Sequence, residues 1–284
     1  MTSNTFIHIS GVLLSLIAAA ILCSGLSHAA GESSNIVKNV SGEGSCAIVG
    51  MSAEQSQLIA LQRARTEAIE KAADIRVSSH TVVTNFRLAA DFIKTYSEGF
   101  IINETVEWLP LGQYQKDSST APIPEYRVRI TADVYKPAPK IGPIGLVARA
   151  NDSIFKSGEK ARIHVETARK ATVGIFNITA DDRVVMLFPN QYDRDSSITE
   201  GQVLSFPRED SPIELVMGTL PGHKRDAEAF FVAAMDDSAM KKFSALFSAM
   251  KPMKLTSFFH VYSEVADYCE DAVIAYEVVG DAHE

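Results

Sequence analysis

The stretch from Ser157 to Asn190, SGEKARIHVETARKATVGIFNITADDRVVMLFPN, constrains the fold of this chain more than any other part of the sequence. It contains three short runs of strand-forming residues, separated by a basic turn and by a turn at Asp181 and Asp182. The runs are Ala161–Thr167, Thr172–Thr179 and Val184–Phe188. Short runs of this kind between turn signals predict an antiparallel β-meander.

The first of these runs alternates in character from one residue to the next. Every second position is filled by Ile163, Val165 and Thr167. The positions between them hold the polar residues Arg162, His164 and Glu166. A period of two predicts a strand with one buried face and one solvated face, which is typical of a half-exposed antiparallel sheet.

The net charge of the chain bears on the partners that it could bind. The formal charge is −8 at pH 7, and the part from Ile141 onwards holds nearly all the excess acid. A nucleic-acid surface needs clustered Lys and Arg to neutralise phosphates, so the sequence argues against nucleic acid and, equally, against anionic lipid. With 284 residues, of which 46% are hydrophobic, the chain is long and apolar enough for two folded domains.

Residues 1–29 have the pattern of a secretory signal peptide. No charged side chain precedes Glu32, and the apolar run Gly11–Leu26 is followed by small residues at Ser27 and Ala29. Cleavage after Ala29, or alternatively after Ala30, would give a periplasmic protein without a stable membrane span, and association with the outer membrane stays open. The apolar run is shorter than the ~20 residues of a spanning helix. Because its leading segment lacks Lys and Arg, a retained single anchor is the alternative.

The cysteines allow two interpretations, a disulfide or separate thiols. Cys23 lies in the apolar leader, but Leu22 does not fit the small residue that precedes a lipidated cysteine, so we do not expect lipidation. Export would leave Cys46 and Cys269 in an oxidising compartment. A disulfide that closes so long a loop would stabilise the fold by about 5 kcal/mol in the chain-entropy model. Otherwise the two are separate, buried thiols.

Residues 30–140 are expected to form an α+β module. A first strand is predicted at Ser45–Val49, and a helix follows because Ser52 and Gln55 have capping-box spacing. Its apolar stripe is mostly alanine, which lets a helix lie close to a sheet. The stripe comprises Leu58, Leu61, Ala64 or Arg65, Ala68, Ala72 and Ile75. A hairpin of two alternating strands follows. Its predicted parts are Ile101–Trp108, the polar loop Gln113–Pro124 and Tyr126–Tyr135.

The order of segments in this module resembles a known family. A GEG strand, the helix QRARTEAIEKAADIRVSSHTVVTNF, a YSEGFI segment and a closing YRVRITADV strand resemble the N-terminal domain of flagellar assembly protein T and its relatives among small outer-membrane lipoproteins. The likeness covers Ser41–Tyr135 and implies an α+β interaction module. A flagellar role is not implied, because the likeness rests on segment order and not on a chemical motif.

Residues 141–284 are expected to form a mainly antiparallel, β-sandwich-like domain with a C-terminal helix. The proline-containing segment Lys136–Pro143 disfavours helix and strand, so we predict that it is a linker. Further strands are predicted at Gln202–Phe206, Ile213–Met217, Ala229–Met235 and Asp271–Val279. A helix after Asp236 carries an apolar stripe that suits a core or a partner groove, and core is favoured. The stripe comprises Met240, Phe243, Leu246, Phe247 and Met250.

This second half also resembles a family. The stretch SGEKARIHVETARKATVGIFNITADDRVVMLFPN, together with EGQVLSFP, LPGHK and FFVAAM, is similar to the family known as domain of unknown function 4384 over Ser157–Met235. The resemblance implies an exported domain that is appended to other modules. One departure concerns the turn, where the family usually has Asp-Gly. Here Asp182 is followed by Arg183, which leaves the hairpin type open.

Sequence motifs for catalysis are missing. The histidines have no partner at zinc-ligand spacing, and neither a nucleophile elbow nor a phosphate loop occurs. The oxygen-rich cluster Asn190, Asp193 and Asp195 is a candidate calcium site, because calcium prefers such ligands. It lacks the glycine and the distant Glu of an EF-hand loop, so a polar loop capped by its Asp side chains is the favoured alternative.

These observations predict an exported, non-catalytic binding or assembly component of a bacterial cell envelope. We expect its partners to be other envelope proteins or a second copy, with no nucleic acid and no cofactor. Two other functions stay open. One is a calcium-assisted periplasmic binding protein, and the other is a hydrolase of unknown type whose nucleophile and base are brought together only by folding.

Overall fold

The computed structural model describes residues 35–74, 95, 99–138, 142–247 and 251–280. The predicted signal peptide, residues 1–29, lies outside this part of the chain, as does most of the segment that precedes β2. From Asn35 onwards the chain forms one compact unit. None of its described helices combines the length and the apolar character that crossing a membrane requires.

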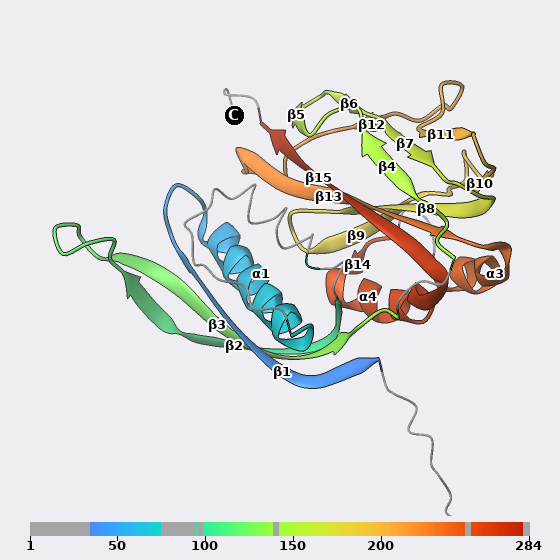
Figure 1. The fold of residues 1–284 in the computed structure, drawn as a ribbon. Coiled ribbons are helices and arrows are strands. Elements are labelled where there is room, and N and C mark those ends of the chain that lie inside the picture. The colour runs from blue at the N-terminus through green and yellow to red at the C-terminus, as the bar shows by residue number, and fades with distance from the viewer. Residues whose placement is uncertain (1–34, 75–94, 96–98, 139–141, 248–250, 281–284) are drawn as a thin grey trace, which may run out of the picture. The chain divides into compact units, whose positions relative to one another are not determined.

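The first sheet has three antiparallel strands, and one helix, α1 (Ala53–Ala72), packs on it (Figure 1). The strands are ordered β1 (Ile36–Ala47), β3 (Ile123–Tyr135) and β2 (Phe100–Tyr114). The predicted hairpin is present but longer than expected. Its strands continue through residues that the sequence assigned to the loop, so that only residues 115–122 connect them.

Strand β1 begins nine residues earlier than the sequence predicted, at Ile36 instead of Ser45. The prediction left Gly42 and Gly44 before the first strand, but both lie in β1 beneath α1. A Cβ atom at Gly42 would lie 2.0 Å from the carbonyl oxygen of Ala64, and one at Gly44 would lie 2.0 Å from that of Ala60. The glycines therefore permit the close approach of helix and strand.

Helix α1 begins as predicted. The Ser52 hydroxyl accepts the backbone N–H of Gln55 at 3.2 Å, and the Gln55 side chain accepts the Ser52 N–H at 3.1 Å, which completes the capping box. The buried stripe is rotated slightly from the predicted one, because Leu58 and Leu61 are only half-buried. The buried residues are Ser56, Ala60, Ala64, Arg65, Ala68, Ile69 and Ala72.

The second half of the chain is built on a seven-stranded sheet. Its path is β14 (Met253–Lys254), β9 (Arg183–Phe188), β8 (Ala171–Ile178), β13 (Arg225–Met235), β15 (Cys269–Val279) and β5 (Ile154–Lys156), with β10 (Ser197–Ile198) beside β8. All pairs are antiparallel except β15 with β5. Strands β8 and β13 are buried along almost their whole length, because both faces of the sheet are covered.

Two small sheets cover one face of the seven-stranded sheet (Figure 1). One consists of β11 (Val203–Phe206), β7 (Ile163–Glu166) and β4 (Val147–Ala150), and the other of β12 (Leu215–Val216) and β6 (Lys160–Ala161). The predicted meander is therefore wrong in one respect. Strand β7 pairs with β4 and β11, not with β8, since the chain crosses between the two layers after Glu166.

Helices cover the opposite face of the seven-stranded sheet. They are α3 (Asp237–Leu246), α4 (Leu255–Ser263) and the 3₁₀ turn η1 (Ala266–Tyr268). Phe243 and Phe247 are buried against Phe176 of β8, which confirms the core interpretation for these two residues. The predicted fold class, an α+β module followed by a mainly antiparallel, sandwich-like arrangement with C-terminal helices, is confirmed.

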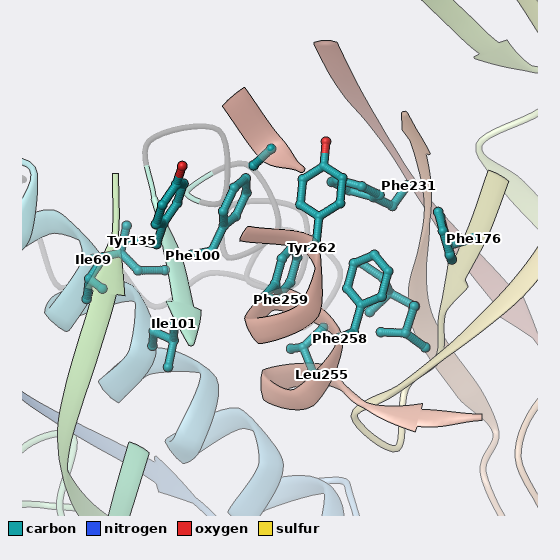
Figure 2. Close-up of a cluster of buried hydrophobic side chains, with 14 of the residues drawn as sticks. Ile69, Phe100, Ile101, Tyr135, Phe176, Phe231, Leu255, Phe258, Phe259 and Tyr262 are labelled. Carbon is teal, nitrogen blue, oxygen red and sulfur yellow. The ribbon is translucent and has the colours of Figure 1, made fainter. Parts of the chain in front are cut away.

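The two sheets share one hydrophobic core, in which α4 lies between them (Figure 2). On one side of α4, the ring of Phe100 at the start of β2 stacks on Phe259 at 5.0 Å. On the other side, Phe258 packs against Phe176 at 4.8 Å and Phe231 at 5.5 Å. The base of the β2–β3 hairpin is thereby fixed to the second half of the chain.

Candidate functional site

The β2–β3 hairpin extends beyond α1 and carries the main group of exposed apolar side chains on the first sheet (Figure 1). Trp108 is 45% exposed and Leu111 is 60% exposed. Val106 and Tyr114 on the same strand are exposed as well. We call these four residues the hairpin patch. Large apolar side chains gathered in this way on a projecting element are typical of contact surfaces.

The two faces of this hairpin differ in chemistry. Val106 and Trp108 lie opposite Ile130 and Val128, which are buried beneath α1. Helix α1 packs mainly on β1 and β3, so this part of β2 stays uncovered among the described residues. The ring of Trp108 meets that of Tyr126 edge to face at 6.3 Å.

The other face of the sheet is solvated and charged. The Arg129 guanidinium lies 2.8 Å from Glu43 and 3.6 Å from Glu107, and all three side chains are well exposed. Hydrogen bonding to Glu43 and the negative charge there raise the pKa of Arg129. Such exposed pairs contribute little to stability, so this face provides solubility around the patch.

The outer edge of β2 is poorly suited to adding another strand. The pairing register shifts between Leu109 and Gly112, and Pro110 lies at that irregularity. Proline donates no ladder hydrogen bond, and a bulge bends a strand away from regular pairing. Contacts at this hairpin are therefore expected to be made by side chains.

A buried arginine ties the strand of the hairpin patch to the second half of the chain. Arg65 of α1 is only 2% exposed, and its guanidinium binds two carboxylates at once. Its Nε and Nη2 donate to Glu104 of β2, and its Nη1 and Nη2 donate to Asp182 at 2.6 and 3.0 Å. Paired contacts of this kind fix direction as well as distance. Sequence reasoning missed this site, although an arginine within an alanine stripe was a signal.

Asp182 adopts the left-handed backbone conformation, with φ of 66°. The Thr179 N–H bonds to the carbonyl of Arg183 at 2.8 Å, which closes a three-residue hairpin loop. The sequence left this hairpin type open, and the structure places Asp182 itself where glycine is favoured. The carboxylate of Asp182 meets Arg65, so the unusual conformation serves to present that carboxylate.

A second buried polar cluster lies on the face of the seven-stranded sheet that meets the small sheets. Glu228 of β13 is 7% exposed, and its Oε2 lies 2.6 Å from the hydroxyl of Tyr276. Asn177 of β8 completes the group, and the N–H of Ala180 donates to Glu228 Oε1 at 3.3 Å. Burial raises the pKa of Glu228, while its hydrogen bonds with Tyr276, Asn177 and Ala180 act in the opposite direction.

Two histidine pairs bear on the hydrolase alternative. His223 Nδ1 lies 2.6 Å from buried Asp226, and His164 Nδ1 lies 2.9 Å from the hydroxyl of Ser205. The second pair spans neighbouring strands of a small sheet. Within the described residues these pairs are separate, and neither joins a hydroxyl, a histidine and a carboxylate in one hydrogen-bonded series as a serine triad would.

The candidate calcium ligands lie in a series of turns. Asn190 Oδ1 accepts the backbone N–H groups of Tyr192 and Asp193 at 2.8 and 2.9 Å. Asp193 accepts from Ser211 at 2.9 Å. Asp195 accepts from the hydroxyl and N–H of Ser197, and these bonds lower its pKa.

These oxygens already have protein donors. Arg208 lies 3.9 Å from Asp193, which adds a positive charge where a cation would bind. The described residues contain no group of three His, Cys, Asp or Glu side chains with metal-binding geometry. The geometry favours the polar loop over a calcium site.

Cys46 and Cys269 are both buried thiols. The structure therefore corresponds to two separate thiols and not to the disulfide that the sequence left open. Burial raises the pKa of the Cys46 thiol, which keeps it protonated and unreactive.

Residues 154–225 match the family model described as Domain of unknown function (DUF4384). The matched segment runs from β5 to the first residue of β13 and includes the small sheets apart from β4, together with Asp182 and the loop from Asn190 to Asp195. Arg65 and Glu228 lie outside it. A search of curated proteins found no match to this chain.

Proposed function

We propose that this protein is an exported, non-catalytic binding or assembly component of a bacterial cell envelope, and that it binds its partner through the hairpin patch. The exposure of Trp108 and Leu111 on a projecting hairpin is the observation that carries the proposal. The leader sequence supports export, and the family matched by the second half supports a domain that works beside other modules. The resemblance of Ser41–Tyr135 to the N-terminal domain of flagellar assembly protein T agrees with an interaction role.

The chemistry of the patch suits a protein partner. Aromatic side chains are enriched at the centre of protein interfaces, and the ring of Trp108 is exposed on this hairpin. The hairpin is held at its base by Phe100 and Arg65. A surface fixed in this way loses less conformational entropy when it binds, which favours affinity.

We propose another envelope protein as the partner, with an apolar groove that accepts side chains of the hairpin. A second copy of this chain is the competing occupant. Pro110 and the adjacent bulge disfavour strand addition, so the partner would contact the side chains of Trp108 and Leu111.

Photo-crosslinking in intact cells tests this proposal. A photoreactive amino acid in place of Leu111 should give one discrete adduct, whose mass distinguishes a different protein from a second copy. The matched control carries the same amino acid in place of Glu107, which pairs with Arg129 on the charged face of the strand, opposite Trp108. Equal adducts from both positions, or none from position 111, would refute the patch. Finding the full-length, unprocessed chain in the cytosol would refute export.

A further inference from the structure

Three side chains from neighbouring strands close a ring of hydrogen-bonding contacts. Glu228 Oε2 lies 2.6 Å from Tyr276 Oη, and Tyr276 Oη lies 2.7 Å from Asn177 Oδ1. Asn177 Nδ2 lies 3.1 Å from the same Oε2 of Glu228, which completes the ring. The three residues lie on β13, β15 and β8, which are adjacent in the sheet.

The number of protons that this ring requires determines the protonation state of the Glu228 carboxyl group. Two of the three contacts join oxygen to oxygen, so each requires a proton, and the Tyr276 hydroxyl supplies one. Exchanging the oxygen and nitrogen of the Asn177 amide does not remove the need for a second proton. The amide oxygen would then face Glu228 Oε2, so two oxygen–oxygen contacts would remain. A protonated Glu228 supplies the missing proton. Glu228 then donates to Tyr276, Tyr276 donates to Asn177, and Asn177 donates to Glu228.

The surroundings agree with a neutral carboxyl group. The titratable groups that act on Glu228 are Tyr276, which bonds to it, and Asp226 on the same strand, which His223 contacts. The loop bonded to Glu228 through Ala180 carries Asp181, paired with Arg183, and Asp182, paired with Arg65. Arg65 is committed to two other carboxylates. The negative charge of Asp226 acts in the same direction as burial and raises the pKa of Glu228.

Glu228 also supports the turn that reaches the first sheet. Its Oε1 accepts the N–H of Ala180, and two residues later Asp182 binds Arg65. The carbonyl of Asp182 also accepts the N–H of Leu255 at the start of α4, at 3.1 Å. A charge on Glu228 would therefore appear directly beneath the loop that joins β8 to β9.

We propose that Glu228 is a buried proton-holding carboxyl group, and that its proton makes the docking of the β8–β9 loop onto α1 and β2 sensitive to pH. The inference concerns the chain's own conformation and does not depend on partner binding. For an acid whose pKa is raised by folding, the stabilisation is complete below the ordinary carboxyl pKa of about 4.3 and is lost as the pH rises through the raised value. The loop should therefore loosen as the pH rises above the ordinary carboxyl range.

Thermal unfolding of the chain from residue 30 tests the proposal. Between about pH 4 and about pH 8 the Tm of the wild-type protein should fall by about 2–4 °C more than that of Glu228→Gln, which cannot ionise. The matched control Glu209→Gln removes an exposed carboxylate and should keep the wild-type profile. Parallel profiles for wild type and Glu228→Gln would overturn the proposal.

A second measurement uses the wild-type protein and does not depend on whether the variant folds. At neutral pH, where exposed carboxyl groups are ionised, the infrared spectrum should contain a protonated-carboxyl band. The band should disappear on unfolding and should shift in Tyr276→Phe, which removes the hydrogen-bond partner of that proton. A wild-type spectrum without such a band would overturn the proposal, as would a band that Tyr276→Phe leaves unchanged.

Discussion

Arg65 and Asp182 lie 117 positions apart in the chain, yet Arg65 Nη1 lies 2.6 Å from Asp182 Oδ1. One residue belongs to the helix of the first sheet, and the other to a hairpin loop of the seven-stranded sheet. Glu104 shares the same guanidinium, so a single buried cation connects α1, β2 and the β8–β9 loop. The hairpin patch begins two residues after Glu104 and depends on this connection for its position.

Replacing Arg65 should strongly destabilise the fold. Arg65→Met keeps the apolar stem but leaves Glu104 and Asp182 without a counter-charge, and breaking a buried pair on one side costs about 3–5 kcal/mol. Denaturant unfolding measures the loss. Lys71→Met breaks the exposed pair with Glu67 and should cost less than about 1 kcal/mol. Similar costs for the two variants would contradict the assigned role of Arg65.

The link between Arg65 and Asp182 should appear as a coupling energy. Asp182→Asn retains a side chain that tolerates the left-handed conformation and removes the charge. In a double-mutant cycle with Arg65→Met, we expect a coupling of about 1–3 kcal/mol. Asp181→Asn, at the exposed neighbouring position, is the control and should give a coupling near zero. An uncoupled Asp182 would mean that the contact contributes nothing to docking.

A methyl group at Gly42 should separate α1 from β1. The added Cβ of Gly42→Ala would lie 2.0 Å from the Ala64 carbonyl oxygen, so the helix would have to move. Overpacking of this kind costs about 1–3 kcal/mol or more, measured by denaturant unfolding. Ser41→Ala, at the exposed adjacent position, should stay within about 0.5 kcal/mol of wild type. A Gly42→Ala variant as stable as wild type would show that the contact can relax.

Calcium should not raise the Tm of this protein. The oxygens of Asn190, Asp193 and Asp195 already accept hydrogen bonds, and Arg208 lies beside Asp193. A ligand that binds only the folded state would raise the Tm by mass action, so thermal unfolding with calcium and with chelator provides the measurement. A calcium-dependent rise that Asp193→Ala abolishes would instead support the calcium-assisted binding protein.

Local signals predicted local structure well. The capping box at Ser52 and Gln55 predicted the start of α1, because both partners lie within one turn. The alternation of Ile163 and Val165 predicted one buried face of β7. It did not predict the sheet to which β7 belongs, because its partners β4 and β11 are not identified by local sequence. Gly42 was misread for the same reason, because only the helix packed above it requires a glycine.

The buried polar groups were harder to predict. Arg65 appeared as an alternative stripe position and Asp182 as an ordinary turn residue, because each depends on a partner far along the chain. Glu228 falls just before the predicted strand Ala229–Met235, although β13 includes it. A lone acid next to so apolar a run was the available signal. The role of Glu228 depends on Tyr276 and Asn177, which lie on two other strands.

The placement of α4 has a practical consequence for dividing this protein. Phe259 faces the first sheet while Phe258 faces the second, so the same helix contributes rings to both. Dividing the chain at the proline-containing segment Lys136–Pro143 would leave Phe100 on one fragment and Phe259 on the other. Each ring would then be exposed to solvent. Fragments expressed separately would therefore tend to aggregate or to reassociate, so both halves should be kept in one polypeptide.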